Sequence, residues 1–319
     1  MSTRLAGLAT SACMAALALA SAQPAGAVKP GAVSTTAEIV CEFRAIASLH
    51  PDPKLRNPDG LADELCPPRS QLPRAYASSR VQIDHFREQY AAYFYVNART
   101  MYIDAALERA VAQGATQVVI LGAGFDSRAY RFHERYPALR FFEVDLPATL
   151  EDKKNRLVMV FGKLPDYVQY ASIDFDHERL EDVLPRLGYE SGQRTFFILE
   201  GVTMYVKAPG NAVTMRFISA HAPRGSRVVY DYLIRRVIEG RFEGLYAVGN
   251  AAIGVAGMGE PFVTGWTPRE AAAFARKNGL RVVEDLGAKE LTQRFLIGSD
   301  GKPDGRMIDG HRIIEAMVP

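Results

Sequence analysis

Strand-like apolar runs alternate with helix-like amphipathic stretches along most of the chain. Runs of strand length and composition occupy residues 118–121, 140–145, 167–173, 195–200 and 227–234. The segments between them, 127–136, 147–160, 177–187 and 209–221, have helical periodicity or open with a proline. Strands that alternate with helices predict right-handed crossovers and a mainly parallel sheet covered on both faces.

The flanking segments have other patterns. Residues 37–73 are rich in Pro, Asp and Asn, which favours turns and short helices, whereas residues 80–113 carry a helical apolar stripe that stops before Gly114. Seven glycines interrupt residues 235–265, which predicts a lid or a variable insertion. A capping box at 267–270 then opens a helix, and residues 280–285 and 312–318 predict closing strands, the latter at an antiparallel edge.

The N-terminus has the layout of a secretory signal peptide. Arg4 precedes an Ala-rich apolar run over residues 5–20, and small residues follow up to Ala27. An upstream start codon chosen in error, or an Ala-rich tail on a cytoplasmic protein, is the alternative. The run is too short for a membrane span, and no later stretch is long and apolar enough. We therefore expect a leader at 1–27, a helical cover at 28–113 and a ligand-binding domain at 114–319 that forms one globular unit with the cover.

Composition narrows the class of partner. The 319 residues are 48% hydrophobic, which allows a large core, and the net charge is only +2 with both signs interleaved. This balance argues against nucleic acid and against an acidic membrane surface as partners. Cys41 and Cys66, the two cysteines that leader cleavage would leave, could form a disulfide or remain half-buried thiols.

Familiar catalytic spacings are missing from the sequence. Neither G-x-S-x-G nor C-x-x-C occurs, and the six histidines are scattered without ligand or triad spacing, so we expect them to have surface or capping roles. No metal is expected.

Acidic residues instead stand at equivalent places along the predicted sheet. Asp126 follows the first strand, Asp145 ends the second, Asp174 follows the third and Glu200 ends the fourth. In an open parallel sheet the ligand crevice lies at these carboxyl ends. Because carboxylates are costly to bury without donors, the four acids predict one ligand that is rich in hydroxyl and amino groups.

The glycines after the first strand allow two kinds of ligand. Gly122 and Gly124 permit close backbone approach, as a dinucleotide or S-adenosylmethionine would need. The third glycine of the dinucleotide fingerprint is replaced by Ser127, and Asp126 would place negative charge near a pyrophosphate. S-adenosylmethionine has no phosphate and carries a positive sulfur, so it is favoured over NAD(P).

Several stretches together resemble the leucine carboxyl methyltransferase-like family of class I S-adenosylmethionine-dependent methyltransferases, and its bacterial O-methyltransferases most closely. They are "NARTMYID", "VVILGAGFDSRAYRF", "FFEVDLPATLEDKKNRL", "ASIDF" and "FILEGVTMYV", within residues 80–285. The resemblance implies a Rossmann-like, doubly wound α/β fold with the seven-stranded, mainly parallel methyltransferase sheet and an N-terminal helical cover.

The resemblance also implies roles for individual residues at the cofactor. Arg99 matches the arginine that pairs with the methionyl carboxylate, and Gly122, with Gly124 beside it, matches the close approach to the methionyl part. Asp145 matches the acid that accepts both ribose hydroxyls, a role that its strand-end position also suggests. Glu200 matches an acid near the cofactor amine and the substrate entrance.

Other matched residues have alternatives or weaker roles. Asp174 and Phe175 match the pair around adenine, although Asp174 could instead cap a helix before His177. Tyr205, just past Glu200, is expected to orient the substrate, with ordinary packing as the alternative.

Four further residues are expected to hold the cofactor loop through local ion pairs rather than to touch the cofactor: Asp126, Arg128, Lys153 and Lys154.

The expected chemistry is in-line methyl transfer, in which the protein mainly aligns the reacting atoms. A carboxylate acceptor needs no base, whereas a hydroxyl would need one such as Glu200 or a histidine. We expect an O-methyltransferase acting on a small molecule or peptide, with substrate contacts from the cover and from residues 235–265. An NAD(P)-dependent oxidoreductase and a non-catalytic binding protein are the alternatives, and the oligomeric state stays open.

The leader hypothesis predicts a mature N-terminus near Val28. Intact-mass analysis of the protein from its native host measures this directly. A mass that retains Met1 or Ser2 would reject cleavage and favour the cytoplasmic alternative.

Overall fold

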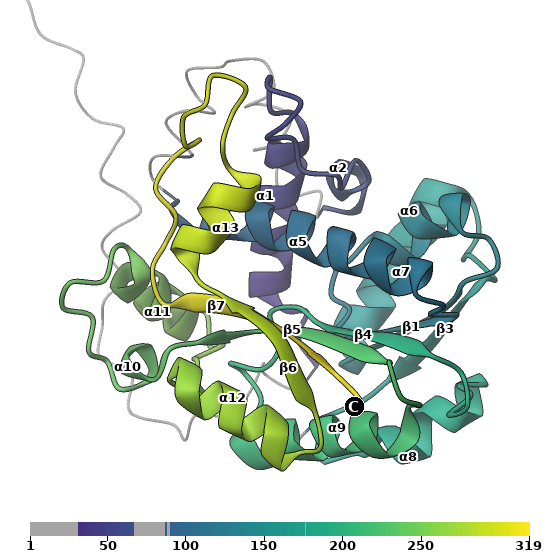
Figure 1. The fold of residues 1–319 in the computed structure, drawn as a ribbon. Helices are drawn as coiled ribbons and strands as arrows, with labels where there is room; N and C mark the ends of the chain where they lie inside the picture. The colour runs from purple at the N-terminus through teal and green to yellow at the C-terminus, as the bar shows by residue number, and fades with distance from the viewer. Residues whose placement is uncertain (1–30, 67–86, 88–89, 176) are drawn as a thin grey trace, which may run out of the picture.

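A seven-stranded sheet forms the centre of the molecule (Figure 1). The computed structural model describes residues 31–66, 87, 90–175 and 177–319, so the expected leader lies outside the described residues. The spatial order is β3-β2-β1-β4-β5-β7-β6, parallel except for β7, which is antiparallel to both neighbours. The strands are β1 Gln117–Leu121, β2 Arg140–Asp145, β3 Val168–Ser172, β4 Thr195–Leu199, β5 Arg227–Leu233, β6 Arg281–Leu286 and β7 His311–Met317.

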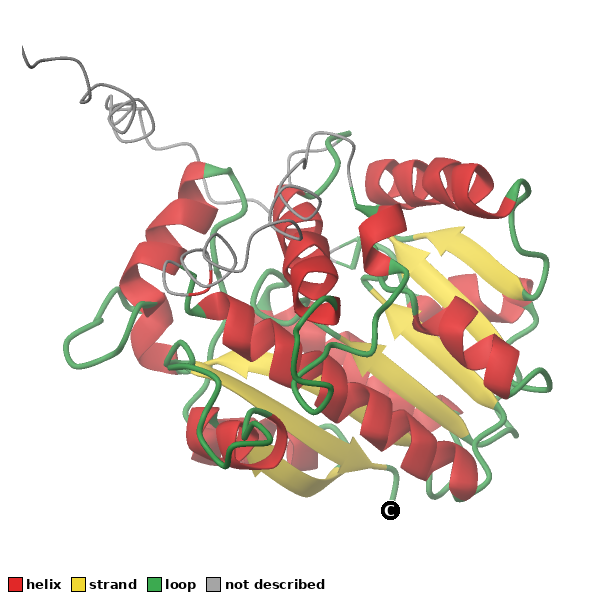
Figure 2. Ribbon diagram, turned by 90° about the horizontal axis from the view of Figure 1, so that it is seen from above, coloured by secondary structure: helices red, strands yellow, loops and turns green. Residues whose placement is uncertain are grey.

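Helices cover both faces of this sheet (Figures 1 and 2). Helices α5, α6, α7 and α13 lie on one face and α8, α9 and α12 on the other, while α1 packs over α5. The doubly wound α/β fold predicted from the alternating pattern is thereby confirmed. The longer helices are α1 Thr35–Ser48, α5 Ala92–Ala112, α6 Arg128–Arg135, α7 Pro147–Phe161, α9 Ala208–His221, α11 Val248–Gly257, α12 Pro268–Lys277 and α13 Ala288–Phe295, and the short ones are α2 Ala62–Leu65, α8 Leu180–Val183, η1 Leu184–Leu187 and α10 Arg235–Ile238.

The central strands are apolar at nearly every position because both of their faces are buried. In β1, Val118 and Ile120 belong to the core beneath α5, whereas Val119 and Leu121 belong to the core on the opposite face. All five residues of β1 and of β4 are buried. A continuous apolar run is therefore the expected sequence of a strand in this position.

The last strand, β7, is antiparallel as predicted, but the prediction that it lies at the edge of the sheet is wrong. β7 lies between β5 and β6, and it pairs along its whole length with β5. Residues 313–316 are all buried, as a central position requires, whereas β6 at the edge exposes Arg281 and Val283. Ile313 on one face of the strand and Ile314 and Ala316 on the other were the signal for a central position.

Two expected helices differ in the structure. The helix expected over 177–187 is reduced to α8 and the 3₁₀ turn η1. Pro185 explains the change, because it has no N–H to donate and its ring clashes with the carbonyl one turn earlier. The helix expected over 80–113 is observed as α5 from Ala92 onwards, and most of its first part lies outside the described residues.

The cover and the glycine-rich stretch contain more helix than their composition indicated. α1 has 14 residues, and the Ser34 side chain caps it by accepting a hydrogen bond from the Ala37 N–H. Residues 235–265 contain α10 and α11. The predicted capping box of α12 is confirmed, since Thr267 Oγ1 accepts from the Glu270 N–H and Glu270 Oε2 accepts from the Thr267 N–H at 2.9 Å.

Cys41 and Cys66 lie side by side within the cover. Both are free thiols with their Sγ atoms 3.1 Å apart, and Cys41 also donates to the Ala62 carbonyl. Of the two alternatives left open by the sequence, the structure has the thiols, and both are buried rather than half-buried.

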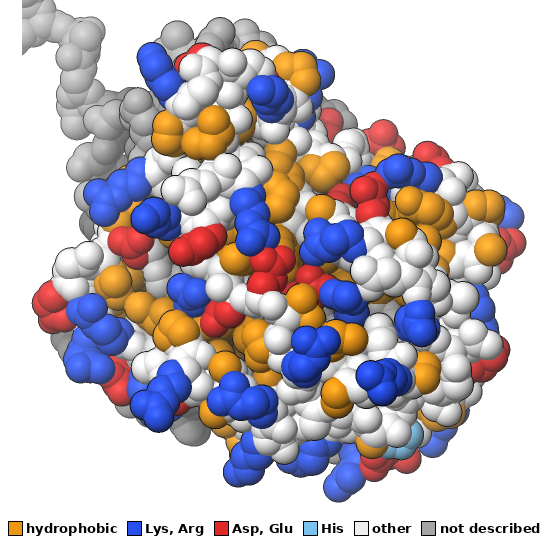
Figure 3. Space-filling view, in the orientation of Figure 1, with side chains coloured by type: hydrophobic (Ala, Val, Ile, Leu, Met, Phe, Trp, Pro, Cys, Tyr) orange, Lys and Arg blue, Asp and Glu red, His pale blue; other side chains and the backbone are white. Residues whose placement is uncertain are grey.

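The face of the molecule seen in Figure 3 carries side chains of both charge signs among apolar ones. Among the described residues, no helix combines the length and the apolar character needed to cross a bilayer.

Lys153 has a structural role that differs from the expected one. Its Nζ lies 2.7 Å from Glu143 Oε2 on β2, and both side chains are completely buried, so Lys153 fixes α7 to the sheet and not the cofactor loop. Burial raises the pKa of Glu143, and the ammonium of Lys153 opposes that shift. Lys154 instead pairs with Glu151 on the surface of α7.

Replacing Lys153 alone should be more harmful than replacing the whole pair. We expect Lys153→Met to lower the free energy of unfolding by about 3–5 kcal/mol, because the Glu143 carboxyl is left buried without its partner. The double variant Glu143→Gln with Lys153→Met should be clearly more stable than the single variant, as measured by urea denaturation. Lys154→Met is the matched surface control, with an expected change within about 0.5 kcal/mol. A double variant no more stable than Lys153→Met would contradict this account.

Candidate functional site

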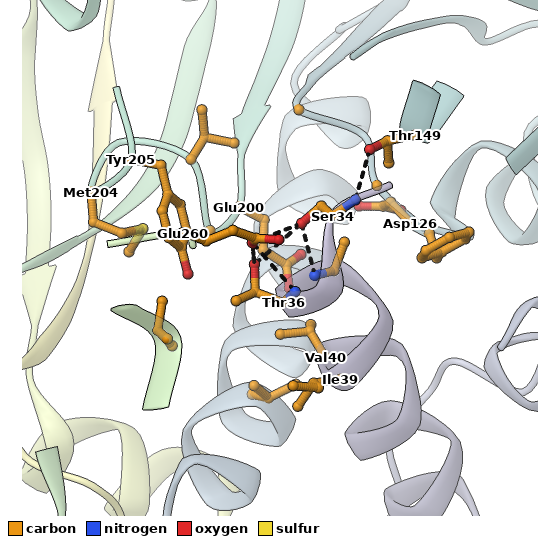
Figure 4. A pocket seen from close by; sticks show the side chains of 18 of the residues that line it. Ser34, Thr36, Ile39, Val40, Asp126, Thr149, Glu200, Met204, Tyr205 and Glu260 are labelled. Atoms are coloured by element: carbon orange, nitrogen blue, oxygen red, sulfur yellow. Dashed lines mark hydrogen bonds between the residues drawn. The ribbon is translucent and has the colours of Figure 1, made fainter. Parts of the chain in front are cut away.

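A cavity of about 260 Å³ opens beyond the carboxyl ends of the parallel strands (Figure 4). It lies beside β1 and β4, where the strand order reverses: β2 and β3 follow on one side of this pair and β5 on the other. Open α/β sheets bind their ligands at such a reversal point. Its lining comes from the ends of β1, β2 and β4, from α1 and α5, and from residues 251–262. The cover and the glycine-rich stretch therefore both reach the cavity.

The loop after β1 is shaped by its two glycines. Gly122 has φ +70°, and a Cβ at this position would collide with Val202 Cγ2. Gly124 has φ +43°, and its N–H donates to the Asp145 carboxylate. Both residues line the cavity, so the backbone can approach a ligand here as predicted.

Asp145 ends β2 with its carboxylate held by the backbone. One oxygen accepts from the Leu146 N–H at 2.6 Å and the other accepts from the Gly124 N–H. Burial raises the pKa of Asp145, and no Lys or Arg among the described residues forms an ion pair with it. The carboxylate keeps unfilled lone pairs at the cavity wall, which is the property a ribose diol would need. The site thus fits an adenosine group, while the ribose role of Asp145 stays a prediction.

Glu200 follows β4 and is clamped between two arginines. Its Oε1 lies 3.0 Å from Arg99 Nε and its Oε2 lies 2.6 Å from Arg128 Nη1. Burial alone would raise the pKa of Glu200, but the two guanidinium groups outweigh it and lower the pKa to about 2. A carboxylate with this pKa accepts a proton poorly, so Glu200 is unsuited to the base role considered from the sequence.

Arg99 reaches the same cluster from α5. In addition to Glu200, it binds Asp231 of β5, with Nη1 2.5 Å from Oδ2. Among the described residues Nη2 has no hydrogen-bond partner, and this is the atom through which Arg99 could reach a cofactor carboxylate. The predicted pairing with the methionyl group therefore stays open to Arg99 without loss of its structural bonds.

The predicted local ion pair between Asp126 and Arg128 is confirmed. The Arg128 N–H donates to Asp126 Oδ1 at 2.7 Å, and the two side chains also pair. Arg128 does more than hold the loop, however, because its side chain is only 2% exposed and also binds Asp104 and Glu200. It joins the β1 loop, α5 and the end of β4.

The adenine candidates lie at the rim of the cavity. The Asp174 side chain is half exposed, and its Oδ2 lies 2.8 Å from His177 Nδ1. The next helix, α8, begins only at Leu180, so Asp174 is not the N-cap of a described helix. Phe175 lines the cavity and packs against the core beside it. Both remain available to a ligand, and their adenine roles stay predictions.

Tyr205 faces the cavity from the loop after β4. Its ring centroid lies 5.3 Å from that of Phe262, and burial raises the pKa of its hydroxyl. Figure 4 places Tyr205 and Met204 across from the first residues of α1. The structure thus places Tyr205 where an acceptor could contact it.

Two cavity residues were not recognised in the sequence. Glu260, 3% exposed, accepts hydrogen bonds from the Thr35 N–H at 2.7 Å and from Ser34 Oγ at 3.1 Å, and so joins the glycine-rich stretch to α1. His311 begins β7 and lines the cavity opposite Tyr95. Neither lies in a motif, and only the tertiary fold brings them to the site.

The strand order, the antiparallel β7 and the acidic crevice at the strand ends agree with the class I methyltransferase fold expected from the sequence. The sequence model of the family "Leucine carboxyl methyltransferase" matches residues 37–219. The chain belongs to this family, and S-adenosylmethionine is its cofactor, which confirms the two central predictions from the sequence. The match begins earlier and ends earlier than the expected range of 80–285, and it leaves both Glu260 and His311 outside.

Bacterial relatives agree with this assignment. Two proteins named "putative S-adenosyl-L-methionine-dependent methyltransferase" are 33% and 32% identical to this chain. The first, from Frankia alni, aligns over 72% of this chain and 78% of its own length. The second, YktD from Bacillus subtilis, aligns over 62% of this chain and 64% of its own length, so just under two thirds of that relative is spanned.

Among solved structures, human N-acetylserotonin methyltransferase in complex with S-adenosylmethionine is similar with a TM-score of 0.43. The sequences are 16% identical, and the match covers 79% of this chain and 60% of that chain.

Replacing Asp145 tests the cofactor site. We expect Asp145→Ala to weaken S-adenosylhomocysteine binding at least about tenfold, since a charge-assisted hydrogen bond contributes roughly 1.5–3 kcal/mol, with little loss of folding. Isothermal titration calorimetry measures the affinity and a thermal melt checks the fold. Unchanged affinity would refute the ribose role.

Proposed function

We propose that the protein is an O-methyltransferase that transfers the methyl group of S-adenosylmethionine to a carboxylate or hydroxyl oxygen of a small molecule or peptide. The observation that carries the proposal is the shape of the cavity. It is continuous from the glycine loop and Asp145 at one end to an apolar region beside Tyr205 and Phe262 at the other. A cofactor and an acceptor could therefore meet inside it.

The cofactor supplies an electrophilic methyl group on a positive sulfur, so the protein's task is to align and enclose the reactants. We assign the glycine loop to close approach, Asp145 to the ribose hydroxyls, Asp174 to the adenine amine and Arg99 to the methionyl carboxylate. Each assignment is supported by the position of the residue on the cavity wall.

The charges of the cavity support this choice over a dinucleotide. Only two basic side chains, Arg44 and Arg99, are among the described residues that line it, and both are paired with acids. The acids that line it are Asp126, Asp145, Asp174, Glu200 and Glu260. This excess of negative charge favours a sulfonium and disfavours a pyrophosphate. The intact set of ligand-facing residues likewise argues against a non-catalytic binding protein.

Two arguments about the location of the protein oppose each other. The layout of residues 1–27 supports export, whereas S-adenosylmethionine is made inside cells and supports retention in the cytoplasm. From the layout of residues 1–27 we propose that the protein is exported. The mass of the mature protein, measured as described above, decides between export and retention in the cytoplasm.

Ligand-dependent stability followed by product analysis tests the function. S-adenosylhomocysteine at a concentration near one hundred times its Kd should raise the Tm by about 5 °C or more, because binding contributes about 2.7 kcal/mol, while NADH should leave it unchanged. Labelled S-adenosylmethionine should then transfer its methyl group to a fraction of cell extract. Release of the label by mild alkali would identify an ester, and retention would identify an ether. A shift with NADH alone would favour the oxidoreductase.

A further inference from the structure

The antiparallel β7 brings a histidine to the acceptor end of the cavity. The register pairs Leu233, the last residue of β5, with His311, the first residue of β7. Since β7 runs opposite to β5, its start lies at the same sheet edge as the carboxyl ends of the parallel strands. His311 therefore lies two strands away from Glu200 in the strand order. Asp145 and Asp174 lie in the other direction from Glu200, at the ends of β2 and β3.

The backbone around His311 fixes its position. Gly310 has φ +86°, and a Cβ there would lie 2.9 Å from Val237 Cγ2, so the turn before the histidine accepts glycine only. The Gly310 carbonyl accepts a hydrogen bond from the Ile234 N–H at 2.8 Å. The imidazole ring packs against Tyr95, with the ring centroids 4.6 Å apart.

The ring is neutral and incompletely bonded. Burial is the main cause that lowers the pKa of His311 to about 4; nearby Arg99 lowers it further and Asp231 opposes the shift. Nδ1 is buried, with the Asp309 backbone beside it, whereas Nε2 is not buried and has no hydrogen-bond partner among the described residues. A neutral imidazole has one nitrogen that accepts and one that donates, so Nε2 can form a hydrogen bond with a ligand in the cavity.

The surroundings of His311 suit an uncharged molecule. Apolar side chains make up much of the cavity wall, among them Val40, Phe43, Val96, Val255 and Ile308. The guanidinium groups on the wall have other partners: Arg44 binds Asp59, and Arg99 binds Glu200 and Asp231 and is assigned through Nη2 to the methionyl carboxylate. Among the described lining residues no cation is left over for an acceptor carboxylate, which would meet an acidic cavity without compensation.

We propose that His311 binds the hydroxyl group of an apolar, uncharged acceptor and so positions its oxygen for methyl transfer. This inference rests on the proposed function and narrows it from any oxygen acceptor to a hydroxyl. The acceptor oxygen forms the new C–O bond, and the electron pair of the broken S–CH₃ bond stays on sulfur. The hydroxyl proton is released to water, because the pKa values of Glu200 and His311 are both too low for a base.

Two probes with the same ring system separate a hydroxyl from a carboxylate. Near neutral pH 2-naphthol is uncharged and 2-naphthoate is ionised. We expect the full-length protein, loaded with S-adenosylhomocysteine, to bind 2-naphthol at least about tenfold more tightly than 2-naphthoate. With S-adenosylmethionine it should convert 2-naphthol to its methyl ether.

Variants of His311 test the role of the ring. His311→Phe should weaken 2-naphthol binding at least about fivefold, the loss of one hydrogen bond, without changing S-adenosylhomocysteine affinity. His311→Gln should restore most of that binding and most of the ether formation, since an amide can also hydrogen-bond the hydroxyl. His221→Phe makes the same substitution on α9, outside the cavity, and should match wild type in every measurement.

The outcomes separate this inference from the function on which it rests. A protein that does not bind S-adenosylhomocysteine contradicts the proposed function. A protein that binds it, yet prefers 2-naphthoate or binds neither probe, overturns the hydroxyl acceptor alone. Binding and methylation of 2-naphthol by His311→Phe at wild-type levels would overturn the role of His311.

Discussion

Two buried guanidinium groups hold the carboxyl end of β4 in place, and the site is organised around them. Arg99 and Arg128 take one oxygen each of Glu200, and each then binds a further acid, Asp231 on β5 or Asp104 on α5. Charges this deeply buried are tolerated only when every partner is present, since a single unpaired member costs several kcal/mol. The network therefore fixes α5, the β1 loop and the ends of β4 and β5 relative to one another, which is the geometry that in-line methyl transfer requires.

The cover is tied to the same loop through a second buried pair. Arg44 of α1 donates to Asp59 at 2.8 Å and to the Phe125 carbonyl at 2.6 Å, and Asp59 in turn accepts a hydrogen bond from Ser127. The residue that replaces the third glycine of a dinucleotide fingerprint thus serves to hold the cover over the cavity. At the other side Glu260 binds the N-terminus of α1, so the cover is fixed at both ends.

The sequence predicted those features that depend on local pattern. Buried strands, strand-end acids and the capping box at Thr267 follow from residues that are neighbours in the chain, and the structure has them where expected. The insertion of β7 between β5 and β6 depends instead on strand pairing between segments about 80 residues apart along the chain, as in the register of Leu233 with His311. His311 and Glu260 reach the cavity only as a result of such pairing, and a lone histidine or glutamate gives no periodic signal. The extent of α1 was missed because its proline-rich flank dominated the composition of the region.

The strand-end acids occupy equivalent places in the sequence, but their surroundings in the structure differ. Asp145 is buried against two backbone amides without a cation, so its free lone pairs make it a receiver of hydroxyl donors. Glu200 is buried between two cations, so it is permanently ionised and its oxygens are already occupied. Asp174 is half exposed and can adjust to a ligand at the rim. A strand-end carboxylate therefore marks the crevice, but the groups that reach it from other elements decide whether it binds a ligand, organises the fold or accepts a proton.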